Sequence, residues 1–532
     1  MVLIPLIYAA IITAAAHGYI KYLQLNNYKV IKAAKNFLKK QSASLIVLSV
    51  LSAVCLCLLI FGDGVSELYI YAAYCAAVLI FTLPYNAAMR KKAKTPLVFT
   101  KRVKRLFAFL YITNALMFFL IYELFGIKIY MIAATLLTLP NIADYAFFAA
   151  AINVLERANN GRYVKRAQKK LSSCKNLIKI GITGSYAKTS VKNILQAMLA
   201  TKYKTAATEK NFNTPLGIAR SVESLDGTEE IFIAEMGARR KGEIKELCDI
   251  VKPDIGIISG ITMQHTETFK SLDNIIETKS ELFYALPDGG MCVFNADDAE
   301  IRGLDILKEP KSLTAGTSDT FGCYAQDIVS DINGSGFTLC FAARSGGNGN
   351  GAAKSKKIAV KTQLIGRANI VNITVAAAAA YYLGVGLSDI RAAIGDLKPV
   401  PHRCEIIKNE NTSVTVIDDA YNSNPVGAAA ALDTLKMFDG RKIVVTCGFA
   451  EQGKNIGAAN GAFGRLIAES ADIAVLIGAD GKYIREGLMS VGFDAENILS
   501  YPSLAAAKKD FNVIFESGDV VLFENDMPDN ME

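Results

Sequence analysis

The sequence has few of the residues that build metal clusters and disulfide scaffolds. Its 532 residues include only three histidines, which excludes a histidine-rich metal site. Its ten cysteines are scattered and form no C-x-x-C pair, so neither a thiolate zinc site nor a disulfide-stapled domain is expected. Reduced thiols in a cytoplasmic compartment are the simplest interpretation. Apolar residues make up 52% of the chain, which excludes a disordered chain of low hydrophobicity.

Acidic residues are scarce in the first third of the chain. Residues 1–170 carry 21 lysines and arginines against 5 acidic residues, a net charge of +16. Residues 171–532 carry 37 against 45, a net charge of −8, so the overall +8 describes neither part. A strongly basic segment indicates contact with a membrane or with a nucleic acid.

Apolar runs in the basic part favour a membrane. Five runs lie at roughly 1–20, 43–62, 66–89, 106–126 and 127–150, and about 20 apolar residues cross a bilayer as a helix. The first run could be a signal peptide, but it lacks a basic start and a clear cleavage site, so we interpret it as a retained helix. We predict a transmembrane helical domain of about five helices over residues 1–156, followed by a basic juxtamembrane linker over 157–174.

Basic residues gather in alternate loops, at 21–40, at 90–105 and from 157 onward. The positive-inside rule then places the N-terminus outside and everything after residue 157 in the cytoplasm. This predicts a multi-pass protein of the cytoplasmic membrane. The third cluster could bind nucleic acid, but contact with anionic membrane lipid already explains it, so we expect a lipid partner and no nucleic acid. A transporter is disfavoured because ionisable residues are rare within the runs.

A strand, a glycine-rich turn and a helical pattern follow the linker. Residues 177–198 read LIKIGITGSYAKTSVKNILQAM, the context that a phosphate-binding loop needs. Lys188 would supply charge to the terminal phosphates, and a hydroxyl next to it would suit Mg²⁺. The strict phosphate-loop pattern is not met, because Ile182 and Ala187 stand where its two glycines would be. The residues expected to bind the nucleotide here are Gly181, Gly184, Ser185, Lys188, Thr189 and Ser190.

Seven further motifs follow in order: NFNTPLG (211–217), IAEMGARRKGEI (233–244), ITMQHTETFKSLDNIIETKSELF (261–283), FNADD (294–298), LIGRANIVN (364–372), HRCE (402–405) and IDDAYNSNP (417–425). With the phosphate loop, they resemble the Mur ligase family, ATP-dependent amide-forming enzymes of peptidoglycan (cell-wall) assembly. The resemblance covers roughly residues 175–525 and is strongest for the branch that adds D-alanyl-D-alanine. It implies an α/β fold, with a P-loop-type central domain over 175–398 and a Rossmann-like C-terminal domain over 399–532. From residue 443 onward, strands that alternate with helical patterns also predict a second parallel α/β domain.

The resemblance implies a metal site. Glu235 ends the apolar strand IFIAE near the phosphate loop, where α/β folds bind ligands and where a carboxylate suits Mg²⁺. Together with Thr189 and His265 it matches the family's metal position. Lys279 matches the lysine that the family carbamylates with CO₂, which turns a cation into a carboxylate-like ligand.

The other motifs are implied to hold ATP and the substrate. Asn295 could belong to a turn, and Asn369 could cap a helix, yet the resemblance places Asn295 and Asn372 beside the nucleotide. Arg403 would meet the γ-phosphate and Asp419 the ribose once the last domain closes. The implied catalytic residues are Lys188, Lys279, His265 and Arg403, and the substrate-side residues are Asn211, Thr214, Tyr421 and Asn424.

The implied reaction is ligation. ATP phosphorylates a substrate carboxylate, and an amine then displaces phosphate to form an amide. The expected acceptor is a muramoyl-peptide and the expected amine is D-alanyl-D-alanine. One departure matters: helices stand where the family has a domain that holds the UDP-sugar. A lipid-linked precursor, an amino-acid polymer as in the cyanophycin and polyglutamate branches, or a non-catalytic ATP-binding membrane scaffold are therefore alternatives.

Overall fold

The computed structural model describes residues 3–26, 28–61, 69–78, 97–138, 142–264, 266–342, 355–409, 413–421, 424–449 and 452–525. The chain divides into two compact units, an N-terminal unit that ends at Gly161 and a second unit from Arg162 to Met527. All ten cysteines are free thiols, as expected.

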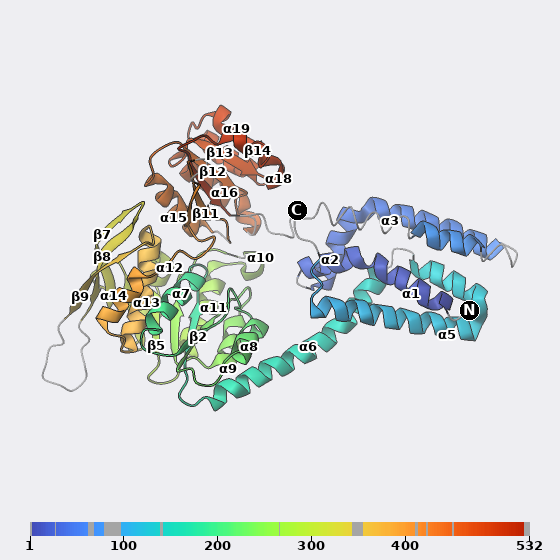
Figure 1. The fold of residues 1–532 in the computed structure, drawn as a ribbon, viewed down its shortest axis with the longest axis horizontal. Helices are drawn as coiled ribbons and strands as arrows, with labels where there is room; N and C mark the ends of the chain where they lie inside the picture. Colours follow the sequence, from blue (N-terminus) through green and yellow to red (C-terminus); the bar gives the residue numbers. More distant parts are fainter. Residues whose placement is uncertain are drawn as a thin grey trace. The chain divides into compact units, whose positions relative to one another are not determined.

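Within the described residues, helices are the regular secondary structure of the N-terminal unit, and no strand occurs there (Figure 1). Its long helices begin and end differently from the apolar runs. The basic stretch 21–40, predicted as a loop, is mostly helical, because α3 starts at Val30 and continues through the second apolar run. Gly126, with φ 76° and ψ 178°, breaks α5 where the fourth and fifth runs were separated. The helices are α1 (Leu3–Ala15), α2 (His17–Leu25), α3 (Val30–Phe61), α5 (Lys101–Thr138) and α6 (Ile142–Ser173), and residues 69–78 are also helical.

Aromatic side chains form the core of this unit. The Tyr8 ring meets Phe118 edge-on at 5.2 Å between centroids, and the Tyr8 hydroxyl donates to the Ala134 carbonyl at 2.7 Å. Apolar side chains, in contrast, stay exposed along the outside of α5. They are Ile112, Leu116, Leu120 and Leu124, which recur every fourth residue and so share one face of the helix.

Two helices of the described part, Pro5–Leu25 and Lys101–Leu136, are long and apolar enough to cross a bilayer. This is a test of length and composition, which a buried core helix or a signal sequence also passes. The third predicted span, 66–89, lies largely outside the described residues. The count of five spans therefore stays a prediction.

Helix α6 differs from the predicted linker. Residues 157–173 belong to one continuous helix, and the boundary between the two units falls inside it, at residues 161 and 162. Its last turns pack into the core of the second unit through Ala167 and Leu171, and Lys170 Nζ donates to the carbonyl of Glu223 at 3.0 Å. The end of α6 is thus an anchored part of the second unit.

A nine-stranded sheet organises the central part of the second unit, in the order β2-β3-β1-β4-β5-β6-β7-β8-β9. Strands β2 to β7 pair in parallel and β7-β8-β9 pair antiparallel. The strands are β1 (Ile178–Thr183), β2 (Thr205–Ala207), β3 (Ile231–Glu235), β4 (Ile255–Ile258), β5 (Met291–Asn295), β6 (Ser312–Gly316), β7 (Cys323–Asp331), β8 (Gly334–Phe341) and β9 (Lys356–Thr362).

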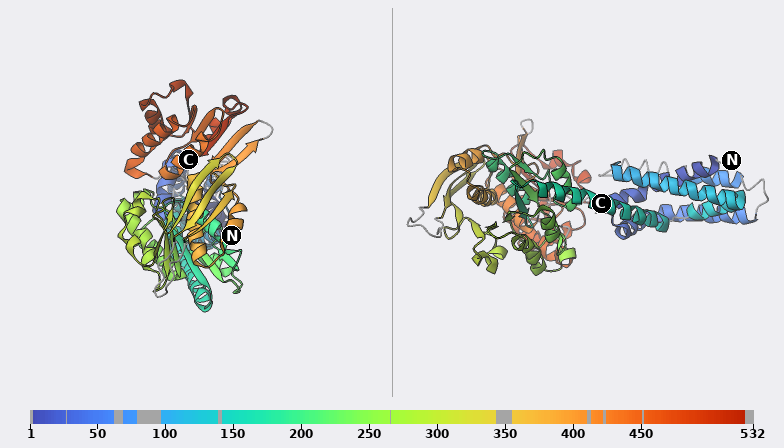
Figure 2. Two further views of the ribbon diagram at one scale, coloured as in Figure 1. Left: turned by 90° about the vertical axis from the view of Figure 1, so that its left-hand side faces the viewer. Right: turned by 90° about the horizontal axis from the view of Figure 1, so that it is seen from below.

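Helices cover both faces of this sheet, which explains the continuous apolar strands (Figure 2). One face packs against α7, α13 and α14, and the other against α8, α9 and α11. The helices are α7 (Lys188–Leu199), α8 (Pro215–Glu223), α9 (Glu243–Val251), α10 (Thr266–Phe269), α11 (Leu272–Tyr284), α12 (Ala299–Arg302), η1 (Asp305–Lys308), α13 (Arg367–Tyr382) and α14 (Leu387–Gly395).

The C-terminal part is the predicted second α/β domain. Its six strands run in the order β10-β11-β15-β12-β13-β14, all parallel except the antiparallel pair β10-β11. The elements are β10 (Glu405–Asn409), β11 (Val414–Asp419), α15 (Pro425–Lys436), β12 (Lys442–Thr446), η2 (Gly453–Asn455), α16 (Ile456–Ala468), β13 (Ile473–Ile477), α17 (Gly481–Ser490), η3 (Ala495–Asn497), β14 (Ile498–Tyr501), α18 (Leu504–Ala507), α19 (Phe511–Ile514) and β15 (Val520–Glu524).

Candidate functional site

The phosphate loop joins β1 to α7. Gly184 has φ 153°, and a Cβ there would lie 2.2 Å from Ser259 Oγ, so only glycine fits. Ser185 ties the loop to the end of β4: its amide donates to the Gly260 carbonyl at 2.7 Å and its hydroxyl donates to the Thr262 carbonyl at 3.0 Å. The loop is therefore held in place by the neighbouring strand.

Gly181 lies elsewhere than expected. It belongs to β1 itself, opposite Ala234 and Gly256, and a Cβ on it would lie 2.9 Å from Leu282 Cδ1 of α11. Gly181 thus lies within the strand that leads into the loop and lets α11 pack closely on the sheet, and its contact with the nucleotide stays a prediction.

Ala187 and Tyr186 are unusual in the loop. Ala187 has φ 61° and ψ 0°, a left-handed conformation that disfavours any residue with a Cβ. Tyr186 lies over Gly260, where a Cβ would overlap its ring, and its hydroxyl donates to Asp298 Oδ2 at 2.5 Å. Burial and the Asp298 carboxylate raise the pKa of Tyr186, so its hydroxyl stays protonated. This contact holds the strained turn.

Lys188 begins α7 directly after the turn. Its Nζ donates to the carbonyls of Gly184 at 2.7 Å and Ser185 at 3.3 Å. Desolvation lowers the pKa of Lys188 to about 8, the Glu235 carboxylate raises it, and Arg403 lowers it. Two residues predicted to meet phosphate, Lys188 and Arg403, are thus close enough to repel each other.

Glu235 is a buried carboxylate beside the loop. It is 1% exposed at the end of β3, and three side chains contact its carboxylate oxygens. Thr189 Oγ1 donates to Oε2 at 3.0 Å, Asn213 Nδ2 donates to Oε1 at 3.1 Å, and Lys192 Nζ lies 3.2 Å from Oε2. Its own backbone amide donates to Thr208 Oγ1 at 3.0 Å.

The Thr189 hydroxyl and the Glu235 carboxylate fit Mg²⁺, which prefers oxygen ligands. They come from the phosphate loop and from a neighbouring parallel strand, so they meet at one edge of the sheet. Ser190, the alternative hydroxyl, follows Thr189 on α7. The predicted ligand His265 lies outside the described residues.

Lys279 is buried on α11, with 2% of its surface exposed. Desolvation lowers the pKa of Lys279 well below that of an ordinary lysine, and the charge of Lys188 lowers it further. Burial therefore favours the neutral form of its amine. The charge of Lys188 thus reaches Lys279, although their helices, α7 and α11, cover opposite faces of the sheet.

The remaining predicted nucleotide residues of the central domain lie on β5 and α13. Asn295 ends β5, is 4% exposed, and donates from Nδ2 to the Ser259 carbonyl at 2.9 Å. A cavity of about 790 Å³ adjoins this edge and is lined by Asp297, Thr317, Phe321, Tyr324 and Arg367, among others. Asn372 is buried on α13, the helix that begins with Arg367. Asn369 does not cap α13, because the N-cap is Gly366 and Asn369 Nδ2 donates to the Ile365 carbonyl at 2.9 Å.

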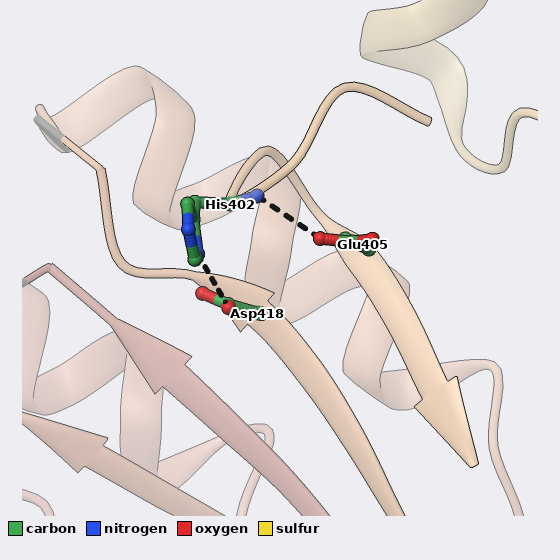
Figure 3. A group of neighbouring side chains, drawn as sticks. All are labelled: His402, Glu405 and Asp418. Carbon is green, nitrogen blue, oxygen red and sulfur yellow. Dashed lines mark hydrogen bonds and ion pairs between the residues drawn. The ribbon is translucent and has the colours of Figure 1, made fainter. Parts of the chain in front are cut away.

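Arg403 lies in a tightly bent segment at the start of the C-terminal domain. Its neighbours His402 and Cys404 both have left-handed φ values, 60° and 52°. Figure 3 shows how the segment is tied down: His402 Nδ1 lies 2.7 Å from Asp418 Oδ2, and the His402 amide donates to Glu405 Oε2 at 3.2 Å. Glu405 and Asp418 are opposite each other on β10 and β11.

Asp419 and Tyr421 flank Arg403. The Cys404 amide donates to Asp419 Oδ1 at 3.1 Å. Burial raises the pKa of Asp419, and the Arg403 charge lowers it. The Arg403 guanidinium lies over the Tyr421 ring at 4.8 Å, and the Tyr421 hydroxyl accepts from Asn211 Nδ2. The structure therefore brings the predicted residues Asn211, Tyr421 and Arg403 together.

Thr214 and Asn424 cap helices. Thr214 Oγ1 accepts from the Gly217 amide at 3.3 Å at the start of α8. Asn424 Oδ1 accepts from the amides of Val426 and Gly427, both at 3.1 Å, at the start of α15. These bonds give both residues a structural role, and their predicted contact with substrate stays a prediction.

Sequence reasoning missed Lys192, Asn213 and Tyr186. Lys192 follows Lys188 by four residues, so the two lysines share one face of α7, and that spacing was a usable signal. Nothing in the sequence shows that Asn213 reaches Glu235, since the two residues meet only through the fold.

Comparison with known proteins agrees with this geometry. Residues 182–380 match the family described as Mur ligase middle domain, and residues 402–524 match the one described as Mur ligase, glutamate ligase domain. The UDP-N-acetylmuramoyl-tripeptide–D-alanyl-D-alanine ligase of Bacillus subtilis is 27% identical over 352 residues, which cover 65% of this chain and 72% of that protein. The ligase of the same name from Mycobacterium tuberculosis H37Rv is 31% identical over 257 residues, so the chain spans about half the length (48%) of this relative.

Solved structures show the same fold. The crystal structure of MurF from Acinetobacter baumannii superposes with a TM-score of 0.61 at 24% identity, covering 70% of this chain and 78% of that one. The MurF ligase of Thermotoga maritima in complex with ADP superposes with a TM-score of 0.57 at 24% identity, covering 69% and 80%. From the phosphate loop to the last strand, the chain carries the middle and C-terminal domains of the Mur ligase family and belongs to that family.

Proposed function

We propose that the chain is an ATP-dependent ligase of cell-wall precursor synthesis that joins D-alanyl-D-alanine to a UDP-N-acetylmuramoyl-tripeptide. One observation carries the chemistry: the Lys188 amine, the Thr189 hydroxyl and the buried Glu235 carboxylate meet where the phosphate loop leaves β1. The names of the relatives supply the acceptor and the amine.

The chain's own residues would act mainly on charge and position. Lys188 would exchange the two loop carbonyls that it now contacts for phosphate oxygens, and Arg403 would neutralise charge on the transferred phosphoryl group. Thr189 and Glu235 would hold Mg²⁺, which when bound screens the negative charge of the phosphates.

The reaction has two steps. A carboxylate oxygen of the acceptor attacks the γ-phosphorus of ATP, giving an acyl phosphate and ADP. The neutral amine of D-alanyl-D-alanine then attacks the acyl carbon, the C–O bond to phosphate breaks, and the amine loses a proton as the amide forms. Asn211 and Tyr421, from the central and C-terminal domains, are proposed to contact the acceptor because they meet beside Arg403.

Lys279 is proposed to be carbamylated. A neutral amine attacks CO₂ to give a carbamate and a proton, and the lowered pKa of Lys279 supports this reaction because it favours the uncharged amine. The carbamate would add an oxygen ligand on the Glu235 side of the site, where His265 is also proposed to bind the metal. Carbon-13 NMR of protein in labelled bicarbonate would show a carbamate signal that Lys279→Ala removes.

The nucleoside is proposed to bind along the carboxyl edge of the central sheet. Parallel strands place the phosphate loop and Asn295 at the same edge, and the cavity beside Asp297 adjoins it. Asn295 and Asn372 would contact the base, and Asp419 the ribose once the C-terminal domain closes.

The N-terminal unit is proposed to insert into the cytoplasmic membrane and to keep the ligase domains in the cytoplasm. The exposed stripe of Ile112, Leu116, Leu120 and Leu124 supports this, because only 22% of the apolar window in Lys101–Leu136 is buried. A core helix of a soluble protein would bury such a face. The basic residues near the end of α6 would meet anionic lipid.

The decisive experiment uses the full chain in detergent with UDP-N-acetylmuramoyl-tripeptide, D-alanyl-D-alanine and ATP. We expect stoichiometric phosphate and ligated product by mass spectrometry, and neither with Lys188→Ala. If only a lipid-linked muramoyl-tripeptide is turned over, the acceptor is a membrane-bound precursor. ATP binding without any product from either acceptor would favour a scaffold and overturn the proposal.

A further inference from the structure

Lys192 is a buried cation that the proposed chemistry leaves unused. It lies one helical turn after Lys188 on α7, and its side chain is 2% exposed. Lysine is almost never fully buried unless it is paired, because removing an ammonium group from water is costly. The contacts that compensate this burial therefore show what the residue does.

Its polar contacts are with the segment that follows β2 and with the Glu235 carboxylate. The Nζ atom donates to the carbonyl of Thr208 at 2.9 Å and to the carbonyl of Lys210, and it pairs with Glu235 Oε2 at 3.2 Å. An ammonium group has three N–H donors, and three acceptors are present. Lys210 has φ 47°, a left-handed conformation for a residue with a side chain, and its carbonyl is one of the three.

Residues 208–213 connect β2 to the cap of α8 and face both halves of the proposed site. Asn213 reaches Glu235, which in turn accepts from Thr189 of the phosphate loop. Asn211 reaches Tyr421 of the C-terminal domain. Within the described residues, Lys192 is thus the side chain that joins this segment directly to α7, the helix that carries Lys188.

We propose that Lys192 is a positioning residue that fixes the acceptor-side segment 208–213 to the phosphate-loop helix. The acceptor and ATP are thereby held in position relative to each other. The inference rests on the proposed function for its kinetic consequence only. Loss of the ammonium group frees the carbonyls of Thr208 and Lys210 and lets Asn211 and Asn213 move. The KM for the acceptor then rises about 10- to 100-fold, the range seen when a supporting residue behind a site is removed.

The test compares Lys192→Met, Glu235→Gln and the double variant by hydrogen exchange of the amides in 208–213, in full-length protein. Lys202→Met is the matched control, since Lys202 Nζ also donates to a backbone carbonyl, that of Gly384, in the same domain. We expect at least tenfold faster exchange in Lys192→Met and in the double variant, and no change in Glu235→Gln or Lys202→Met. The double variant lacks the uncompensated carboxylate, so it keeps the test available if Lys192→Met does not fold.

Restored protection in the double variant would overturn the inference, because it would show that Lys192 only balances the charge of Glu235. Unchanged exchange in Lys192→Met would overturn it as well. An acceptor KM that rises while kcat changes less than about threefold supports positioning, whereas equal losses for all substrates indicate a general loss of structure. Hydrogen exchange needs no turnover. An inactive wild type would therefore contradict the proposed function, and the exchange rates would still decide this inference.

Discussion

The two units of the chain use apolar residues in opposite ways. In the second unit, Ile180 and Ile257 are completely buried between a sheet and its helices. In the N-terminal unit, the centre holds tyrosines such as Tyr8, while Leu116 and Leu124 are 59% and 71% exposed on α5. An outer surface of leucine is unfavourable in water and favourable in lipid. The comparison supports the proposal that one chain is built for two solvents, and the experiments below test it one unit at a time.

The largest effect is expected from Lys188→Ala, which should disable the second unit without touching the first. Loss of one charged phosphate contact should reduce kcat/KM for ATP by about 10²- to 10³-fold, as removal of a single stabilising donor does. Phosphate release measures the loss. Membrane fractionation should be unchanged, and a variant that leaves the membrane would contradict the separation of the two units.

The complementary change is Leu120→Asp on the exposed stripe of α5. An aspartate at the centre of a membrane helix costs about 2.5–3.5 kcal/mol, so the membrane-bound fraction should fall. Val513→Asp is the control, because Val513 is 82% exposed on α19 and a surface change there should stay within about 0.5 kcal/mol. Equal membrane-bound fractions of the two variants would show that both units face water.

Raising the pH should act on the second unit alone. The pKa of Lys188 is lowered to about 8, so about half of it is charged at pH 8 and about a tenth at pH 9, and kcat/KM for ATP should fall about fivefold between these two values. Stability should move the other way. Because the unfolded lysine binds a proton that the folded one has lost, the free energy of unfolding should rise from pH 8 toward the unfolded pKa near 10.5. Lys188→Arg should flatten the dependence of activity on pH. A wild-type profile without a fall above pH 8 would contradict the assignment of this titration to Lys188.

The smallest effect is expected from Ala187→Gly. Glycine removes a left-handed strain of about 1–2 kcal/mol but adds flexibility to the unfolded chain, so the net gain should be below about 1 kcal/mol. That corresponds to a rise in Tm of a few degrees for the second unit, measured by calorimetry. A lower Tm would show that Tyr186 and Asp298 already relieve the strain at this turn.

The sequence located much of the site. The strand–turn–helix of the phosphate loop, Glu235 at a strand end and a second α/β domain are all present, because these features follow from local pattern and strand direction. Local pattern could not show that Gly181 also serves the packing of Leu282 against β1. It also misplaced the basic stretch at 21–40, since lysines are good helix formers and α3 simply continues through them.

Composition and motif order were enough to determine the division of the chain, its charge asymmetry and its family. The tertiary structure alone decided which groups meet. Lys192 and Thr189 come from α7 and Asn213 from the segment before α8, and these two segments converge on Glu235 because parallel strands bring their carboxyl ends to one edge of the sheet. Folding also lowers the pKa values of Lys188 and Lys279, since it buries both amines and brings the charge of Arg403 near Lys188 and the charge of Lys188 near Lys279, residues that are far apart in the sequence.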